Sequence, residues 1–167
     1  MSRRSRAEIE RAGIEAIRGW QVDQDMFDEA AAAYVGINRT DARCVDLIDR
    51  AGRMTAGQLA TAAHLTSGAV TAVLDRLEEA GLVRRVRDPG DRRRVLVEVT
   101  PELAAVSAPI YGPLVEEGVG WIAKYSDDQL ETILDFMERN REILARHTIR
   151  VMQMTAKRER QAAARAG

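Results

Sequence analysis

Residues 55–100 place two short capped helices directly before a β-hairpin, and this order restricts the fold more than any other feature of the chain. Thr55–Gln58 is a capping-box pattern, in which a hydroxyl at the N-cap and a glutamine three residues later satisfy free backbone N–H groups. It predicts a helix over 56–64. A second start predicts a helix over 66–80, which ends at Gly81, a residue suited to a left-handed C-cap.

The residues after this second helix change to the period of β-strands. The runs 82–86 and 95–99 are rich in β-branched residues and predict two strands. Between them, Asp88-Pro89-Gly90-Asp91 supplies strong turn chemistry, because proline fixes φ and glycine frees it. Two short helices joined by a tight turn and followed by a hairpin indicate a winged helix-turn-helix.

Longer helices are predicted on both sides of this segment. Apolar residues recur at helical spacing over 5–35, a helix capped by Thr40 is expected to reach Ala51, and a further helix is expected over 101–125. A capping box at 126–129 opens the last helix. The first and last helical regions are each about 30 residues, or about 45 Å. A core of about 60 residues cannot cover such lengths, so a second copy of the chain is the simplest cover.

The expected fold class is therefore mainly α with a small β-hairpin. Residues 37–100 form a winged helix-turn-helix lobe, and residues 1–36 and 101–167 form a dimerisation lobe of long N- and C-terminal helices, in one intertwined domain. No stretch of 18 residues is continuously apolar and no apolar signal segment opens the chain. We therefore expect a cytoplasmic protein that has no membrane partner.

Charge is distributed unevenly along the chain. The net charge is only −1, but residues 84–94 hold six arginines against two aspartates, while residues 101–142 carry an excess of acids. Because binding to a polyanion depends on the local field, the basic segment matters more than the average. An arginine-rich hairpin tip beside a helix-turn-helix predicts binding to double-stranded DNA.

The second helix of such a unit presents its N-terminal residues to base edges in the major groove, and an arginine-tipped wing suits the narrow minor groove. Small residues at the helix start would let it sit deep in the groove, and Arg76 could reach a phosphate or hold the wing. The candidate DNA-binding residues are Thr55, Thr66, Ser67, Ala69, Val70, Thr71, Arg76, Arg84, Arg87, Asp91, Arg92, Arg93 and Arg94.

Other classes of function receive less support. A winged-helix module for protein–protein contact would fit the near-zero net charge, but it would not need three adjacent arginines. No Gly-rich phosphate loop, Ser/His/Asp arrangement or metal-ligand spacing is legible, so we expect no enzyme, no cofactor and no metal site. Cys44 is the only cysteine. It is interpreted as a buried thiol, with a redox sensor as the alternative.

The hairpin and its surroundings resemble the MarR (multiple antibiotic resistance regulator) family. The resemblance is carried by Asp88-Pro89-Gly90-Asp91-Arg92-Arg93, by the later Leu96 and Val99-Thr100, and by the run 74–83. In the family's wing signature Val99 stands where a leucine is usual. The flanking helices follow the family's order, so that the likeness spans nearly the whole chain.

The resemblance implies a homodimer whose recognition helices enter successive major grooves of a (pseudo)palindromic operator, acting as a repressor. Arg93 would insert into the minor groove, and Asp91 would orient an arginine, with Arg76 as its expected partner. A small phenolic or lipophilic effector would bind between the dimerisation helices and the DNA-binding lobe, with ordinary core packing as the alternative for each candidate wall residue. These candidates are Trp20, Met26, Phe27, Tyr34, His64 and Tyr111.

Overall fold

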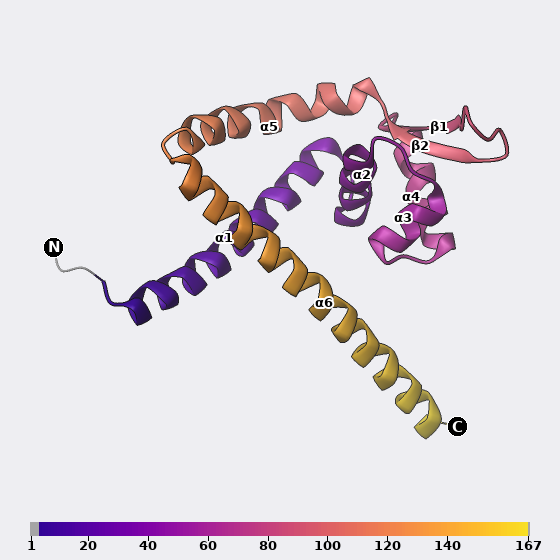
Figure 1. Ribbon diagram of the computed structural model, residues 1–167. Helices are drawn as coiled ribbons and strands as arrows, with labels where there is room; N and C mark the ends of the chain where they lie inside the picture. Colours follow the sequence, from indigo (N-terminus) through magenta and orange to yellow (C-terminus); the bar gives the residue numbers. More distant parts are fainter. Residues whose placement is uncertain (1–3, 167) are drawn as a thin grey trace. The chain divides into compact units, whose positions relative to one another are not determined.

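The computed structural model describes residues 4–166 and confirms a mainly helical fold with one antiparallel hairpin. The chain divides into two compact units, which meet within a helix at Pro113 and Leu114 and are described separately. Figure 1 shows the elements in chain order: α1 (Arg6–Val35), α2 (Arg39–Ala51), α3 (Ala56–Ala63), α4 (Ser67–Glu79), β1 (Val83–Arg87), β2 (Val95–Val99), α5 (Pro101–Ile122) and α6 (Asp127–Ala166).

Side-chain caps set most of the helix starts that the sequence predicts. Ser5 and Thr55 form complete capping boxes at α1 and α3, and Thr66 caps α4 by accepting a hydrogen bond from the backbone N–H of Ala69. The predicted cap of α2 is wrong. Asn38 caps this helix, and Thr40 lies inside its first turn.

The core of the first unit lies where α2, α3, α4 and the hairpin meet. Its fully buried side chains include Ile48, Leu59, Leu74 and Leu77, and Val97 of β2 closes it from the hairpin side. Aliphatic residues thus supply the packing, as the low aromatic content of 4% requires. This core fixes α4 against the helices before it and against the base of the hairpin.

The hairpin is paired in a single register. Val83 lies opposite Val99 and Arg87 opposite Val95, with Arg84 facing Glu98 across the strands. Backbone hydrogen bonds between Met54 and Val97 add a short third segment to the sheet. Burial is confined to the base of the hairpin, and the residues near its tip are exposed. The wing therefore projects from its anchored end.

The second unit contains the end of α5 and the whole of α6. Trp121 and Tyr125 contact edge to face, with ring centroids 5.3 Å apart. Large apolar side chains of α6 are exposed in the single chain, among them Leu134, Leu144 and Val151, at 52–58%. Within residues 4–166, no helix is long and apolar enough to span a membrane.

Candidate nucleic-acid interface

The N-terminal turns of α4 present a polar face away from the core. Val73, Leu74 and Leu77 are buried on one side of the helix, whereas Thr66, Ser67 and other residues of the opposite side are exposed. One residue that was predicted to contact DNA does not lie on this exposed face. Val70 is only 1% exposed and packs in the core, because it shares the helical stripe of the other buried residues.

The small residues at the start of α4 differ in whether their hydroxyls form hydrogen bonds within the protein. Thr71 donates its hydroxyl to the carbonyl oxygen of Ser67 at 3.0 Å, and Thr66 Oγ1 accepts from the Ala69 N–H at 3.2 Å. Ser67 has no side-chain hydrogen bond within the part of the chain that the structure describes. Ala69 is partly exposed. This surface is smooth and carries no charged side chain in its first turn.

The tip of the wing is held by its own backbone and aspartates. Asp88 Oδ1 accepts the N–H of Gly90 at 2.8 Å, and Asp91 Oδ1 accepts the N–H of Arg93 at 3.0 Å. Asp88 also lies 3.6 Å from the guanidinium of Arg94. These contacts order the turn so that its arginines project into solvent.

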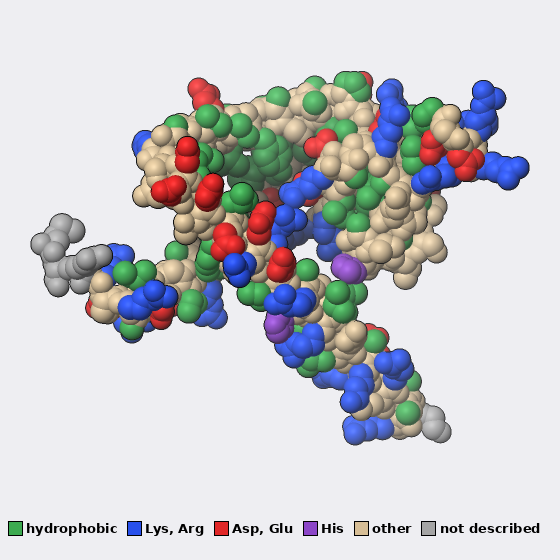
Figure 2. Space-filling model, in the orientation of Figure 1, with side chains coloured by type: hydrophobic (Ala, Val, Ile, Leu, Met, Phe, Trp, Pro, Cys, Tyr) green, Lys and Arg blue, Asp and Glu red, His purple; other side chains and the backbone are tan. Residues whose placement is uncertain are grey.

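Three wing arginines carry no ion pair or side-chain hydrogen bond among residues 4–166. Figure 2 shows basic side chains standing out from the hairpin. Because their guanidinium groups have no internal partner, all five N–H donors of each are available to a ligand. They are Arg87, Arg92 and Arg93.

Arg76 does not pair with Asp91, contrary to the expectation from the resemblance. Its guanidinium donates to both carboxylate oxygens of Asp41, Nε to Oδ2 at 2.9 Å and Nη2 to Oδ1 at 2.6 Å. Asp41 is 2% exposed and also accepts from the side-chain amide of Asn38. The hydrogen bonds with Asp41 raise the pKa of the Arg76 guanidinium. Arg76 therefore ties α4 to α2 and does not brace the wing tip.

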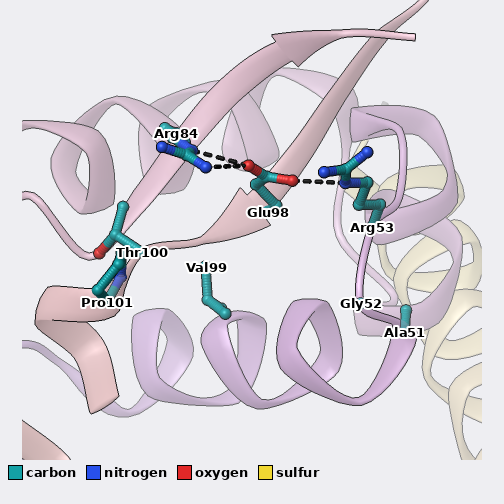
Figure 3. A pocket seen from close by; sticks show the side chains of 8 residues that line it. All are labelled: Ala51, Gly52, Arg53, Arg84, Glu98, Val99, Thr100 and Pro101. Carbon is teal, nitrogen blue, oxygen red and sulfur yellow. Dashed lines mark hydrogen bonds and ion pairs between the residues drawn. The ribbon is translucent and has the colours of Figure 1, made fainter. Parts of the chain in front are cut away.

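Arg84, another predicted DNA contact, also has an internal partner. Figure 3 shows its guanidinium and that of Arg53 on either side of the carboxylate of Glu98. Arg84 donates to Glu98 Oε1 at 2.7 Å, and Arg53 donates to Oε2 at 2.5 Å. Hydrogen bonds from Arg84 and Arg53 lower the pKa of Glu98 and outweigh the opposing effect of burial. We call Arg53, Arg84 and Glu98 the wing clamp.

On the face of the hairpin opposite to the wing clamp, a second set of ion pairs joins the wing to α4. Arg85 of β1 donates to Asp75 at 2.6 Å and forms a further ion pair with Glu78. Both carboxylates belong to the exposed side of α4. Helix α4 and the strand β1 are thereby joined by side chains as well as by the core.

A cavity of about 710 Å³ opens within the first unit beside α1, α2 and α5. Its apolar lining includes Ala31, Val35 and Leu103, and its polar lining includes Arg43 and Asp46. Such a volume suits a drug-sized or smaller molecule. Helix α2 both lines the cavity and carries Asp41, which holds Arg76 of α4.

Only one of the predicted effector-binding residues lines this cavity. Tyr111 does, and burial raises the pKa of its phenol, helped by Asp28 and Asp46. Phe27 contacts Tyr111 edge to face, with ring centroids 5.6 Å apart. His64 instead ends α3 in a left-handed conformation. The remaining candidates are exposed residues of α1: Trp20, Met26 and Tyr34.

Cys44 lies in the core with no exposed surface. Burial is the main cause that raises the pKa of its thiol. A protonated, inaccessible thiol reacts slowly, because the thiolate is the reactive form. The geometry thus favours the interpretation of Cys44 as a packing residue.

Two residues of the site, Asp41 and Glu98, were not predicted, although the sequence indicates that each needs a partner. Asp41 falls on the same helical stripe as Cys44, Val45 and Ile48, so a carboxylate there had to find a partner. Glu98 follows from the hairpin register, which puts it opposite Arg84. Its second partner, Arg53, lies 45 residues away in sequence, and no local pattern indicates that contact.

Comparison with known proteins places this geometry in a family. A model described as the MarR family matches residues 37–95. A protein of Bacillus subtilis named uncharacterized HTH-type transcriptional regulator YcgE is 34% identical over 152 residues, 91% of this chain and 99% of its own length. Relatives of this kind are transcriptional regulators rather than enzymes.

Solved structures show the same fold. A variant of MepR from S. aureus, bound to an oligodeoxyribonucleotide, has a TM-score of 0.51 at 16% identity, covering 78% of this chain and 96% of that one. NadR in complex with 4-hydroxyphenylacetate has a TM-score of 0.53 at 23% identity, covering 83% and 96%. The winged-helix architecture is thus shared with proteins seen with DNA and with a small phenolic acid.

Proposed function

Because the chain belongs to the MarR family of transcriptional regulators, we propose that it binds a palindromic or pseudo-palindromic DNA operator as a homodimer, represses transcription there and is released by a small-molecule effector. In this proposal residues 37–100 form the DNA-binding lobe, and residues 1–36 and 101–167 form the dimerisation helices. The solved structure of a MepR variant with an oligodeoxyribonucleotide supports DNA as the partner.

The observation that carries the proposal is the set of free arginines at the wing tip. The guanidinium groups of Arg92 and Arg93 have no internal partner among residues 4–166, while the start of α4 exposes small polar residues. A smooth helix end fits the major groove, and a free guanidinium fits the negative potential of the minor groove. We assign minor-groove insertion to Arg93 and contacts with phosphate or groove edges to Arg87 and Arg92.

The test is fluorescence anisotropy of a labelled duplex taken from upstream of the protein's own gene. Arg93→Ala should weaken binding about tenfold or more and make the salt dependence shallower by about one unit of slope. Arg160→Ala is the matched control, since it removes an exposed arginine from the end of α6. Equal affinities for Arg93→Ala and the wild type would contradict the wing assignment.

The effector proposal rests on the cavity beside α1, α2 and α5. Its wall combines apolar side chains with Tyr111 and charged groups, a composition that suits a small aromatic molecule with polar ends. NadR holds 4-hydroxyphenylacetate, a molecule of this class. The same anisotropy assay, titrated with phenolic acids, would report release of DNA if ligand binding favours a conformation with weaker affinity.

A protein–protein function for the wing makes the opposite prediction. If the arginine tip served such a contact, no duplex would bind with measurable, salt-dependent affinity. The exposed, unpaired arginines favour DNA over a protein surface, since adjacent guanidinium groups match a row of phosphates.

A further inference from the structure

We propose that Glu98 is a positioning residue, whose carboxylate sets the direction of the wing and so places Arg93 in the minor groove. The inference rests on the proposed function of Arg93. It concerns the wing clamp at the base of the hairpin, where Arg84, Glu98 and Arg53 meet (Figure 3).

Few residues of the wing strands are buried, and apart from the wing clamp the ion pairs of the strands with the helices among residues 4–166 are those of Arg85 with Asp75 and Glu78. Val83, Val97 and Glu98 are the buried residues of its strands, while residues 89–95 are all exposed. From Glu98 to Val95 the strand β2 rises about 10 Å, at about 3.3 Å per residue, and Arg93 lies two residues further on in the turn. A tilt of about 10° at the base would therefore move the end of the strand by about 2 Å, and the tip by more. Such a displacement is enough to break a hydrogen bond in a groove.

The two faces of the hairpin base are anchored by different means. On the inner face, Val97 packs in the core and exchanges backbone hydrogen bonds with Met54 at 3.1 and 2.8 Å. On the outer face, the carboxylate of Glu98 is shared by Arg84 of β1 and Arg53 of the turn between α2 and α3. The wing clamp thus fixes the outer face of the hairpin to the helical part of the lobe.

The carboxylate is what allows the two guanidinium groups to lie together. Glu98 is 7% exposed, and the hydrogen bonds to its two oxygens come from opposite sides. Without its negative charge, Arg53 and Arg84 would face each other as like charges and repel. Each is more than half exposed and could swing into water, at 53% and 60%. The hairpin base would then lose its outer anchor while its core packing remained.

The experiment compares two effects on DNA affinity that have opposite signs, the change of net charge and the loss of the wing clamp. Glu98→Gln adds one net positive charge, which by itself should strengthen binding to DNA. Loss of the wing clamp should instead weaken binding about tenfold. Glu79→Gln is the matched control, because Glu79 is exposed at the end of α4 and forms no ion pair among residues 4–166. Its affinity should stay equal to that of the wild type or rise slightly.

A double-mutant cycle shows whether Glu98 acts through Arg93. In an Arg93→Ala background, Glu98→Gln should change the dissociation constant by less than about twofold, since no minor-groove arginine remains to be misplaced. Thermal unfolding of each variant by circular dichroism reports the fold. If Glu98→Gln melts below the assay temperature, Arg53→Gln enters the same cycle, because Arg53 is half exposed and outside the core.

The outcomes separate the two proposals. Tighter binding by Glu98→Gln, or fully additive effects of Glu98→Gln and Arg93→Ala, would overturn the positioning role and leave the DNA-binding function standing. Wild-type affinity of Arg93→Ala would overturn the wing assignment and the role of Glu98 together. Weaker binding by Glu98→Gln that vanishes in the Arg93→Ala background supports both.

Discussion

The ion pair between Asp41 and Arg76 shows how a single side chain links parts of the DNA-binding lobe. Asp41 lies near the start of α2 and Arg76 in α4, and the two hydrogen bonds between them are in the bidentate arrangement. Asn38 caps α2 and also donates to Asp41. One carboxylate thus holds the capping side chain of α2 and the guanidinium on the recognition helix α4.

We expect Asp41→Ala to lower the free energy of unfolding by about 2 kcal/mol, because the guanidinium and the Asn38 amide lose a buried acceptor. Asp25→Ala is the matched control. It removes the carboxylate that pairs with Arg39 at 2.6 Å, but that carboxylate is 69% exposed, so its loss should cost about 0.5 kcal/mol or less. Urea unfolding measures both, and equal losses would contradict the role given to burial.

Residue-scale prediction from sequence succeeded where one local pattern decided the outcome. The wing arginines lie in a turn that the sequence marks, and the structure leaves Arg92 and Arg93 in solvent. It failed for Val70, which belongs to both the helix start and the core stripe. It also failed for the partner of Arg76, because the carboxylate that binds it is 35 residues away in the chain.

At the scale of elements, the junction of α4 and β1 depends on backbone conformation. Gly81 has φ +73°, a left-handed conformation, and Leu82 donates its N–H to the carbonyl of Leu77 at 2.9 Å across the helix end. This junction turns the chain directly from the recognition helix into the wing. A side chain at position 81 would meet no neighbouring atom within 4 Å, so only backbone strain opposes one.

Gly81→Ala should therefore destabilise the fold by about 1 kcal/mol. Gly13→Ala should do the reverse, since Gly13 lies within α1, has no atom near its would-be Cβ and gains helix propensity from alanine. The two midpoints of thermal unfolding should move in opposite directions from the wild-type value. A stabilised Gly81→Ala would refute the strain argument.

The elements themselves were largely predictable because caps and periodicity agree along this chain. Ser5, Thr55 and Thr66 each cap the helix they were expected to begin. The error at α2 has a simple cause, since Asn38 and Thr40 are both good N-cap residues two positions apart. Here the amide of Asn38 accepts the N–H of Asp41, and this contact decides where the helix begins.

At the scale of the whole molecule, the exposed apolar side chains of the long helices support the proposed homodimer. Trp20, Val22 and Met26 of α1 and Leu144 and Val151 of α6 are each more than half exposed in the single chain. An isolated monomer rarely carries so many large apolar side chains in water. The sequence could indicate a second copy of the chain from helix length alone. Periodicity predicts neither how the helices of two copies would pack together nor the cavity beside α2.

The proposed homodimer predicts the effect of charges on the apolar stripe of α6. Leu144→Arg combined with Val151→Arg should raise the dimer dissociation constant at least about hundredfold, because each side chain would contribute about 1.5–3 kcal/mol on burial. Light scattering after size-exclusion chromatography measures the mass. Operator binding should fall in parallel, since a monomer holds only one half-site.

Gln153→Arg provides the control for this substitution. Residue 153 lies about 180° around α6 from Leu144, at 100° per residue, so an arginine there adds charge without entering the stripe. It should remain dimeric and bind the operator as the wild type does. A double variant that stays dimeric would show that α6 does not pair through this stripe. A monomer that still binds the full operator tightly would show that affinity for the operator does not depend on dimerisation. The two half-sites would then have to be occupied independently.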